Sequence, residues 1–161
     1  NELNFSGNDK IAYLTQTTLS IDDTQNIINE LRKKFPNIES SPKEDICYAT
    51  SNRQKAIKEY ADKCDAFIVV GSKNSSNSNR LVEVAKKAGC INSHLLENAE
   101  SLNLSNYSSS NIIGISSGAS VPEILVENVI SKFQKNYSLE IENVSLGEED
   151  VQFKLPKEVR N

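Results

Sequence analysis

The chain has 161 residues, which suits one ordinary domain or parts of two small ones and allows a core without disulfide or metal support. Hydrophobic residues make up 37% and charged residues 25%, with a formal net charge of −4, so we expect a soluble globular protein. The acidic balance argues against a nucleic-acid partner, and the longest apolar run, residues 66–70, is too short to cross a membrane.

Three residue types narrow the options further. The sequence has no methionine and opens on Asn1 in a polar stretch, so we expect a fragment of a longer protein. Its single histidine excludes a complete mechanism built on several histidines. Its three cysteines, Cys47, Cys64 and Cys90, are an odd number without a CxxC pair, which favours a reducing compartment over a disulfide framework.

The first predicted unit is a short strand over residues 11–14, a polar loop over residues 15–18 and a helix. Ser20 is a typical N-cap, because two acidic residues follow it in the first turn of the helix. The helix is expected to run to Phe35, before Pro36. Its expected inward stripe consists of Ile27, Ile28, Leu31 and Phe35.

The middle of the chain holds the strongest strand-like run. Residues 66–70 are apolar throughout, as expected for a parallel strand that is covered on both faces. One helix is predicted before this strand, over residues 52–63. Another is predicted after it, from the polar loop at residues 72–78 to about residue 88, with Gly89 as its C-cap.

Further strands are predicted at residues 91–96 and 112–115, and a last helix begins near Pro122, whose missing N–H is not needed there. Residues 151–155 alternate like another strand. These repeated strand–loop–helix units predict an α/β fold with small parallel sheets. Ligands in such folds bind beyond the carboxyl ends of the strands.

Polar residues gather in three of the loops that lead from a strand into a helix. The first loop contains Thr17, the second contains Ser75, Ser76 and Asn77, and the third contains Ser120. Helix N-termini offer free N–H groups and the positive end of the dipole, and hydroxyl and amide groups add further donors. We therefore expect a pocket for a small phosphorylated molecule, although ordinary helix caps use the same residue types.

The cysteines fall into two kinds. Cys47 lies in a loop before a helix, among charged and polar neighbours, which favours an accessible and reactive thiol; an inert loop cysteine is the alternative. Cys64 follows a helix and Cys90 precedes a strand, so we expect both to be small buried residues. His94 has no acidic or cysteine partner nearby in the sequence and is expected to be structural or on the surface.

Four segments resemble motifs of the 4-hydroxy-3-methylbut-2-enyl diphosphate reductases, the LytB-type iron–sulfur enzymes. In chain order they are TQTTLS at 15–20, DICYATSNRQ at 45–54, VGSKNSSNSNRL at 70–81 and GASVPE at 118–123. Four motifs in the right order are far more specific than any one of them. The resemblance extends over nearly the whole chain, from residue 11 to the tail at residues 155–160.

The resemblance implies an enzyme that removes the hydroxyl of 4-hydroxy-3-methylbut-2-enyl diphosphate as water. It uses two electrons and forms isopentenyl and dimethylallyl diphosphate, the last step of the methylerythritol phosphate route. A 4Fe–4S cluster is implied, held by three cysteines of which Cys47 matches the last, and Thr17 matches a threonine near the substrate hydroxyl. Ferredoxin or flavodoxin is the implied electron donor, in a bacterial cytoplasm or a plastid. The implied diphosphate contacts are Ser75, Ser76, Asn77 and Ser120.

The same resemblance implies three α/β domains around a central cluster. Residues 1–45 would form the C-terminal half of the middle domain, residues 46–135 the third domain, and residues 136–161 a tail that returns to a missing first domain. The family's other two cluster cysteines, its substrate histidines and its acidic proton donor have no counterpart here. We therefore expect no catalytic acid in this chain and no activity from the chain by itself.

Two other functional classes remain open. A non-catalytic phosphate-binding α/β module would use the same loops, with Cys47 incidental. A transferase acting on a nucleotide or sugar phosphate would need a general base or metal-binding carboxylates beside Ser75, and the sequence supplies neither there. The substitution Cys47→Ser separates these classes, since only a reductase should lose all activity in the full-length protein.

Overall fold

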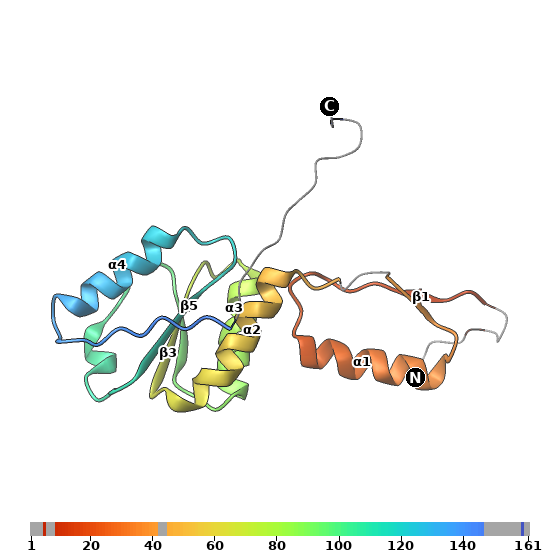
Figure 1. Ribbon diagram of the computed structural model, residues 1–161, viewed down its shortest axis with the longest axis horizontal. Coiled ribbons are helices and arrows are strands. Elements are labelled where there is room, and N and C mark those ends of the chain that lie inside the picture. Colours follow the sequence, from red (N-terminus) through yellow and green to blue (C-terminus); the bar gives the residue numbers. More distant parts are fainter. Residues whose placement is uncertain (1–4, 6–8, 42–44, 147–158, 160–161) are drawn as a thin grey trace.

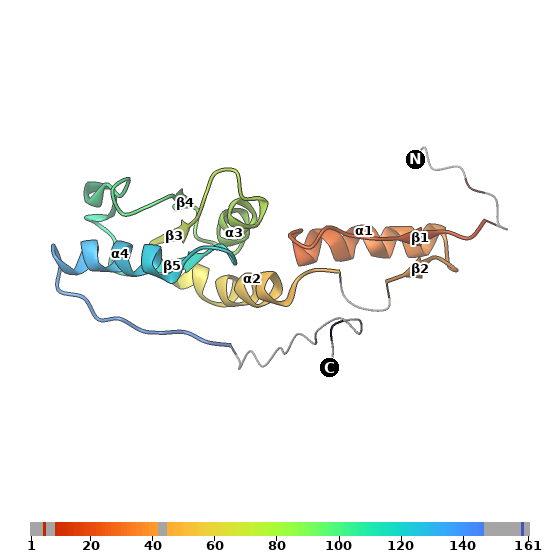
Figure 2. The ribbon, with the colours of Figure 1, turned by 90° about the horizontal axis from the view of Figure 1, so that it is seen from above.

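The computed structural model describes residue 5, residues 9–41, residues 45–146 and residue 159. Figures 1 and 2 show a smaller unit around one helix and a larger unit in which helices flank a sheet. The smaller unit contains β1 (Ala12–Tyr13), α1 (Ile21–Lys34) and β2 (Glu39–Ser40). The larger unit contains α2 (Tyr48–Tyr60), η1 (Ala61–Lys63), β3 (Ala66–Val70), α3 (Ser76–Lys87), β4 (Ser93–Leu96), η2 (Leu104–Tyr107), β5 (Ile113–Ser117) and α4 (Glu123–Gln134).

The described part of the larger unit is built on a parallel sheet in which β3 lies between β4 and β5. Every residue of β3 is buried, because helices pack on both faces of the strand. Phe67 and Val69 belong to the core under α2 and α3, whereas Ile68 and Val70 belong to the core under α4 and η2. The predicted covered parallel strand and the α/β class with small parallel sheets are therefore confirmed.

The smaller unit has a less complete core. Its two described strands, β1 and β2, are parallel to each other and two residues long. Ser20 caps α1 as predicted, because its side chain accepts a hydrogen bond from the Asp23 N–H at 3.3 Å. The predicted inward stripe is wrong at Ile27, which is 61% exposed, and among the described residues of α1 it is Thr24 that is buried. Two short strands are too narrow to cover a four-turn helix.

The predicted start of α2 is wrong by four residues. The helix begins at Tyr48 rather than Asn52, and its first backbone hydrogen bond runs from the Ser51 N–H to the Cys47 carbonyl at 2.9 Å. The polar run before Asn52 gives no helical periodicity. It forms a helix because Thr50 and Ser51 are buried by tertiary packing, which outweighs local propensity.

The remaining elements lie close to their predicted places. Gly89 takes a φ of +117° after α3, which agrees with its predicted role as C-cap, and α4 begins directly after Pro122. β4 and β5 each begin a residue or two later than predicted. The predicted strand at residues 151–155 lies outside the described residues. No helix in the described part of the chain is long and apolar enough to cross a membrane.

Asp65 fixes the start of β5 beside β3. Its carboxylate accepts hydrogen bonds from the Asn111 N–H at 2.8 Å and the Ile112 N–H at 3.0 Å. The bonds from Ile112 and Asn111 lower the pKa of Asp65, because they stabilise the charged form. These two hydrogen bonds hold the start of β5 beside the start of β3.

Ion pairs connect α1 to the helices of the larger unit. Asp22 lies 2.7 Å from the ammonium of Lys58 on α2, and Asp23 lies 3.0 Å from Lys87 and 3.7 Å from Arg80, both on α3. The hydrogen bond from Lys87 is the largest cause of a lowered pKa at Asp23. The two acidic residues that mark the first turn of α1 in the sequence therefore also orient this helix against its neighbours.

Gln54 makes the most buried polar connection between α1 and α2. Its side chain is fully buried; its Nε2 donates to the Leu19 carbonyl at 2.8 Å, and its Oε1 accepts from the Ile21 N–H at 3.1 Å.

We expect Gln54→Leu to lower the free energy of unfolding by about 1–3 kcal/mol, because two backbone groups lose their partners. Urea denaturation measures this change. Gln25→Leu is the control, since Gln25 is exposed and bonds to Asn29 within α1. Equal losses in the two variants would contradict the assignment.

Candidate functional site

The candidate site lies at the carboxyl ends of β3 and β5. Val70 pairs with Ser117, so the two parallel strands end at the same level, and the loops that follow them leave the same edge of the sheet. α3 and α4 begin at this edge, because each follows one of these strands. α2 ends where β3 begins, so its first turn also lies toward this edge, on the side of the larger unit that faces α1 (Figure 1). Three helix N-termini therefore face one region.

The two loops after β3 and β5 meet at Ser78. A Cβ atom placed on Gly71 or on Gly118 would overlap the Ser78 hydroxyl, and Ser78 is itself fully buried. The Gly118 N–H also donates to the Val70 carbonyl at 3.0 Å, which ties the second loop to the end of β3. Glycine is therefore required at both positions for close approach. Ser78 was not among the residues predicted from the sequence, although it lies three residues after Ser75, which is the usual spacing between a capping side chain and the N–H that it satisfies.

The structure brings the predicted residues Ser75, Ser76 and Asn77 together at the first turn of α3. Ser75 caps the helix, with its hydroxyl accepting from the Ser78 N–H at 3.2 Å, so the capping interpretation is correct for this residue. Ser76 is exposed, and Asn77 is 8% exposed with an amide oxygen that has no partner among the described residues. A buried amide oxygen without a partner is costly, so this position suits a ligand group that presents a hydrogen-bond donor.

The helix termini at this edge differ in charge. α4 carries Glu123 in its first turn, whereas the first turns of α2 and α3 contain no acidic residue. The positive end of the dipole is therefore not neutralised locally in α2 and α3, which suits an anionic ligand. Ser120 lies exposed in the turn before α4, on the loop that contacts Ser78 through Gly118.

Thr17 and Cys47 are joined through their backbones. The Cys47 N–H donates to the Thr17 carbonyl at 3.1 Å, although the two residues are distant in sequence. A second connection holds the same two segments, because Asp45 accepts from the Thr15 N–H at 2.9 Å and from its hydroxyl at 3.3 Å. Cys47 is exposed, in no disulfide, and occupies the N-cap position of α2. The accessibility predicted for this thiol is thus confirmed.

The other cysteines do not resemble metal ligands. Cys90 is 2% exposed in the core, and Cys64 is half-buried with its thiol donating to the Tyr60 carbonyl at 3.3 Å. Burial raises the pKa of the Cys64 thiol, which disfavours the thiolate. His94 is exposed and contacts Asn92 through a ring nitrogen at 2.6 Å. These placements agree with the packing and surface roles predicted for the three residues.

The positions of the three cysteines show how many ligands this chain could give to a 4Fe–4S cluster. Such a cluster needs several thiolate ligands, and within the described ranges no group of three or more His, Cys, Asp or Glu side chains could hold a metal ion. Cys47 has the exposure and the helix N-terminus that suit one ligand. Within the described residues, the cysteines therefore fit one ligand of such a cluster, Cys47.

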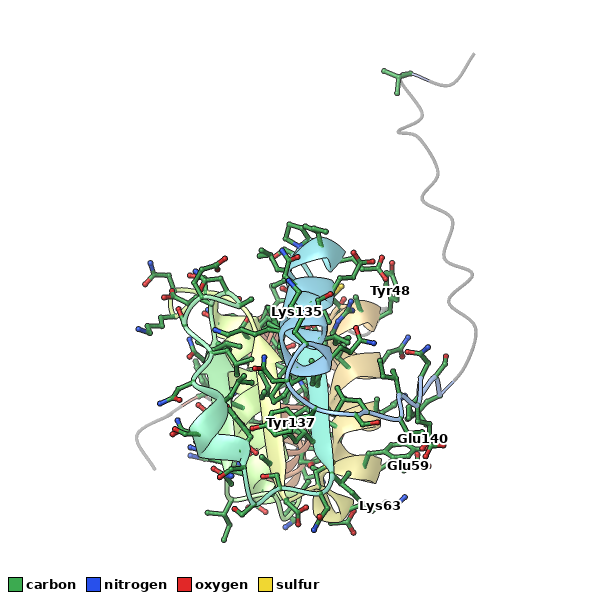
Figure 3. The ribbon with its side chains drawn as sticks, turned by 90° about the vertical axis from the view of Figure 1, so that its left-hand side faces the viewer. Tyr48, Glu59, Lys63, Lys135, Tyr137 and Glu140 are labelled. Carbon is green, nitrogen blue, oxygen red and sulfur yellow. The ribbon has the colours of Figure 1, made fainter. Side chains whose placement is uncertain are left out.

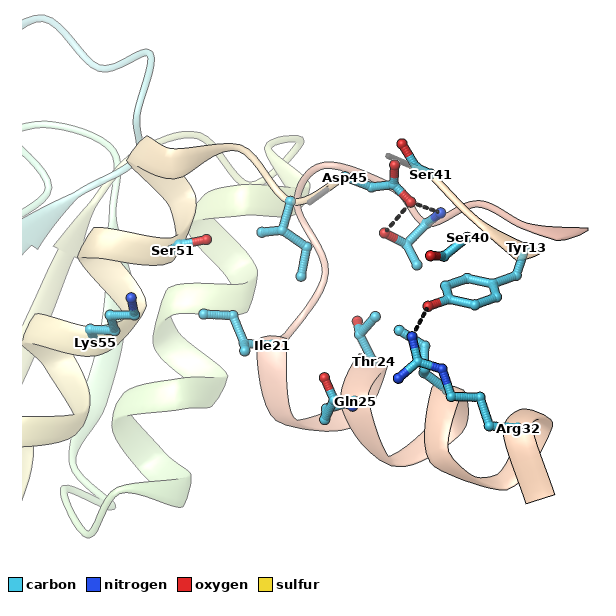
Figure 4. Close-up of a pocket in the computed structure, with 13 residues that line it drawn as sticks. Tyr13, Ile21, Thr24, Gln25, Arg32, Ser40, Ser41, Asp45, Ser51 and Lys55 are labelled. Atoms are coloured by element: carbon cyan, nitrogen blue, oxygen red, sulfur yellow. Dashed lines mark hydrogen bonds between the residues drawn. The ribbon is translucent and has the colours of Figure 1, made fainter. Parts of the chain in front are cut away.

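Two of the cavities in the described part of the chain are formed by other residues than the predicted site residues. One, of about 420 Å³, lies between α1, β1 and the start of α2 (Figure 4). Beside it, Arg32 donates to the Tyr13 hydroxyl at 3.2 Å, and the buried Thr24 hydroxyl has no partner among the described residues. The other, of about 810 Å³, lies between β5, α2 and the chain after α4, which passes from Tyr137 to Glu140 toward α2 (Figure 3). Neither cavity is lined by any of the six predicted site residues.

Comparisons with known proteins agree with the motifs. The sequence pattern of the LytB protein family matches residues 1–134. The chain is 49% identical, over 93% of its length, to the 4-hydroxy-3-methylbut-2-enyl diphosphate reductase of Beijerinckia indica, and 49% identical, over 94%, to that of Acinetobacter baumannii. It spans about half the length of these curated relatives, 47% and 48% respectively.

Solved structures give the same result. The chain resembles the E-1-hydroxy-2-methyl-but-2-enyl-4-diphosphate reductase from Plasmodium falciparum with a TM-score of 0.87 and 39% identity. That match covers 98% of this chain and 50% of the other. A second reductase structure, described as the terminal enzyme of the non-mevalonate pathway, matches with a TM-score of 0.54 and 31% identity, over 78% of this chain and 44% of the other. The chain therefore belongs to the LytB protein family.

Proposed function

We propose that this chain supplies the diphosphate-binding loops and one cluster cysteine of a 4-hydroxy-3-methylbut-2-enyl diphosphate reductase. The observation that carries the proposal is the position of the four family motifs. Three of them lie in the loops and helix starts at one edge of the larger unit, and the fourth, at residues 15–20, is hydrogen bonded to the segment just before α2. The chain is 49% identical to relatives with that name. Because the chain spans about half of those relatives, it acts with the polypeptide that corresponds to the other half.

The diphosphate group is held by neutral donors. Ser75, Ser76 and Asn77 present hydroxyl and amide groups at the first turn of α3, and Ser120 presents a hydroxyl from the adjoining loop. The uncompensated N-terminus of α3 attracts the anion without a permanent counter-charge. The unpartnered atom of Asn77 is its amide oxygen, an acceptor, so a hydroxyl of the substrate would satisfy it, whereas the diphosphate oxygens would accept from the amide nitrogen.

The reacting end of the substrate lies near Thr17 and Cys47. The reaction replaces the carbon–oxygen bond of the substrate by a carbon–hydrogen bond, and two electrons and two protons release the hydroxyl as water. A bound 4Fe–4S cluster supplies the electrons and a Lewis-acidic iron, with Cys47 as one of its ligands. Thr17 is exposed and its carbonyl accepts from the Cys47 N–H, which supports a role for its hydroxyl in holding a proton near the departing oxygen.

The proposed organisation follows the predicted division. Residues 1–45 form part of a middle domain, residues 46–135 a third domain, and residues 136–161 a tail that returns to a first domain. The break at residue 45 is supported by the arrangement of the two units in Figure 1. Ferredoxin or flavodoxin delivers the electrons, in a bacterial cytoplasm or a plastid, and neither nucleic acid nor membrane is a partner.

A chimera tests the proposal. This chain replaces the matched half of the Acinetobacter baumannii reductase, and the protein is purified and reconstituted with iron and sulfide without oxygen. We expect cluster binding and conversion of the substrate to both five-carbon diphosphates, with a reduced viologen dye as electron donor. A chimera that folds and binds inorganic pyrophosphate but has no turnover would favour the non-catalytic phosphate-binding module instead.

A further inference from the structure

Ser78 is fully buried at the point where the two loops of the candidate site meet. Its hydroxyl lies where a side chain on Gly71 or Gly118 would have to lie. It belongs to α3, yet it contacts a loop that follows a strand about 40 residues later in the sequence. Such a residue is placed to affect both loops without touching the ligand.

The hydrogen bonds of Ser78 define the role of Ser75. A serine hydroxyl has one donor and two acceptor positions. The Ser75 oxygen accepts from the Ser78 N–H at 3.2 Å and from the Ser78 hydroxyl at 3.1 Å, so both acceptor positions are used. Ser78 is fully buried, and its hydroxyl makes no other hydrogen bond among the described residues, so its proton would lack an acceptor if Ser75 were the donor. The half-buried Ser75 hydroxyl can instead donate its proton outward. A ligand at this position must therefore present an acceptor.

We propose that Ser78 is a positioning residue that makes Ser75 a dedicated hydrogen-bond donor for the diphosphate. The proposal rests on the diphosphate site of the proposed function. Without the Ser78 hydroxyl, one acceptor position of Ser75 becomes free. Ser75 can then also accept hydrogen bonds from water or from a protonated phosphate, and the site loses its preference for an acceptor-only anion.

The test measures the binding of inorganic pyrophosphate to the full chain by calorimetry and by phosphorus NMR. We expect Ser78→Ala to lower the affinity about tenfold, because a Ser75 hydroxyl that Ser78 no longer orients loses most of its hydrogen bond to the anion. Ser75→Ala should have a similar effect, and the double variant should be no weaker than either single one, because the two residues act through one contact. The phosphorus shift of saturated pyrophosphate should change alike in all three variants.

Ser93→Ala is the matched control. Ser93 begins β4 and is 1% exposed, and its hydroxyl donates to the Cys90 carbonyl. The substitution therefore removes an equally buried hydroxyl that lies away from the two loops. We expect its affinity and phosphorus shift to equal those of the wild type. Should Ser78→Ala fold poorly, Ser78→Cys keeps the volume and donates only weakly, and the same loss of affinity is expected.

Each result decides one proposal. If the wild-type chain does not bind pyrophosphate, the diphosphate site of the proposed function is wrong and the role of Ser78 falls with it. If the wild type binds and Ser78→Ala binds equally well, the role of Ser78 is wrong and the diphosphate site stands. Additive losses in the double variant, or an unchanged phosphorus shift, also overturn the role of Ser78, since a purely structural residue would give them.

Discussion

In the chimeric reductase, Cys47→Ser is expected to abolish stable cluster binding and to lower turnover more than about 100-fold. The thiolate is the ligand that iron–sulfur clusters require, and a serine hydroxyl is a poor replacement for it. The position of Cys47 supports the size of this effect, because its thiol is exposed, in no disulfide, and lies at the N-terminus of α2. Iron and sulfide content, visible absorption and product formation measure the result.

Cys64→Ser is the control for this experiment. The Cys64 thiol is half-buried and donates to the Tyr60 carbonyl, a bond that a serine hydroxyl can keep. We expect this variant to retain its iron and its activity. Full iron content in Cys47→Ser, or equal losses in the two variants, would show that Cys47 is not a ligand.

Gly118→Ala is expected to lower both the stability of the larger unit and its affinity for pyrophosphate. The added methyl group would overlap the Ser78 hydroxyl, so the loop after β5 must move away from the loop after β3. Overpacking of this kind costs about 1–3 kcal/mol. Urea denaturation and pyrophosphate calorimetry on the same preparation measure the two effects.

Ser120→Ala separates the loss of affinity from the loss of stability. Ser120 lies two residues after Gly118 on the same loop, but its side chain is exposed. Ser120 is exposed, so its loss should leave the free energy of unfolding within about 0.5 kcal/mol of the wild type. Its proposed contact with the diphosphate should still make pyrophosphate bind more weakly. A Gly118→Ala variant with wild-type stability and affinity would show that the two loops do not depend on their close approach at Ser78.

Local features of the chain were predictable where they depend on neighbouring residues. Ser20 was recognisable as a cap, and capping was one of two interpretations of Ser75, because the N–H groups that they satisfy lie three residues away. The strand Ala66–Val70 was recognisable because five consecutive apolar residues need cover on both faces. The motifs around Thr17, Cys47 and Asn77 are each continuous in the linear sequence, so they indicate the family without any knowledge of the fold.

Contacts between distant segments were decided by the tertiary structure. The start of α2 at Tyr48 depends on the burial of the polar residues that follow, and the exposure of Ile27 depends on how little sheet lies beside α1. Ser78 and Gly118 are 40 positions apart, so no local pattern shows that one excludes a side chain on the other. The sequence thus indicated the groups that we propose as diphosphate contacts. Parallel pairing of β3 with β5 decided that they face one region, because only that pairing brings the two loops to one edge of the sheet.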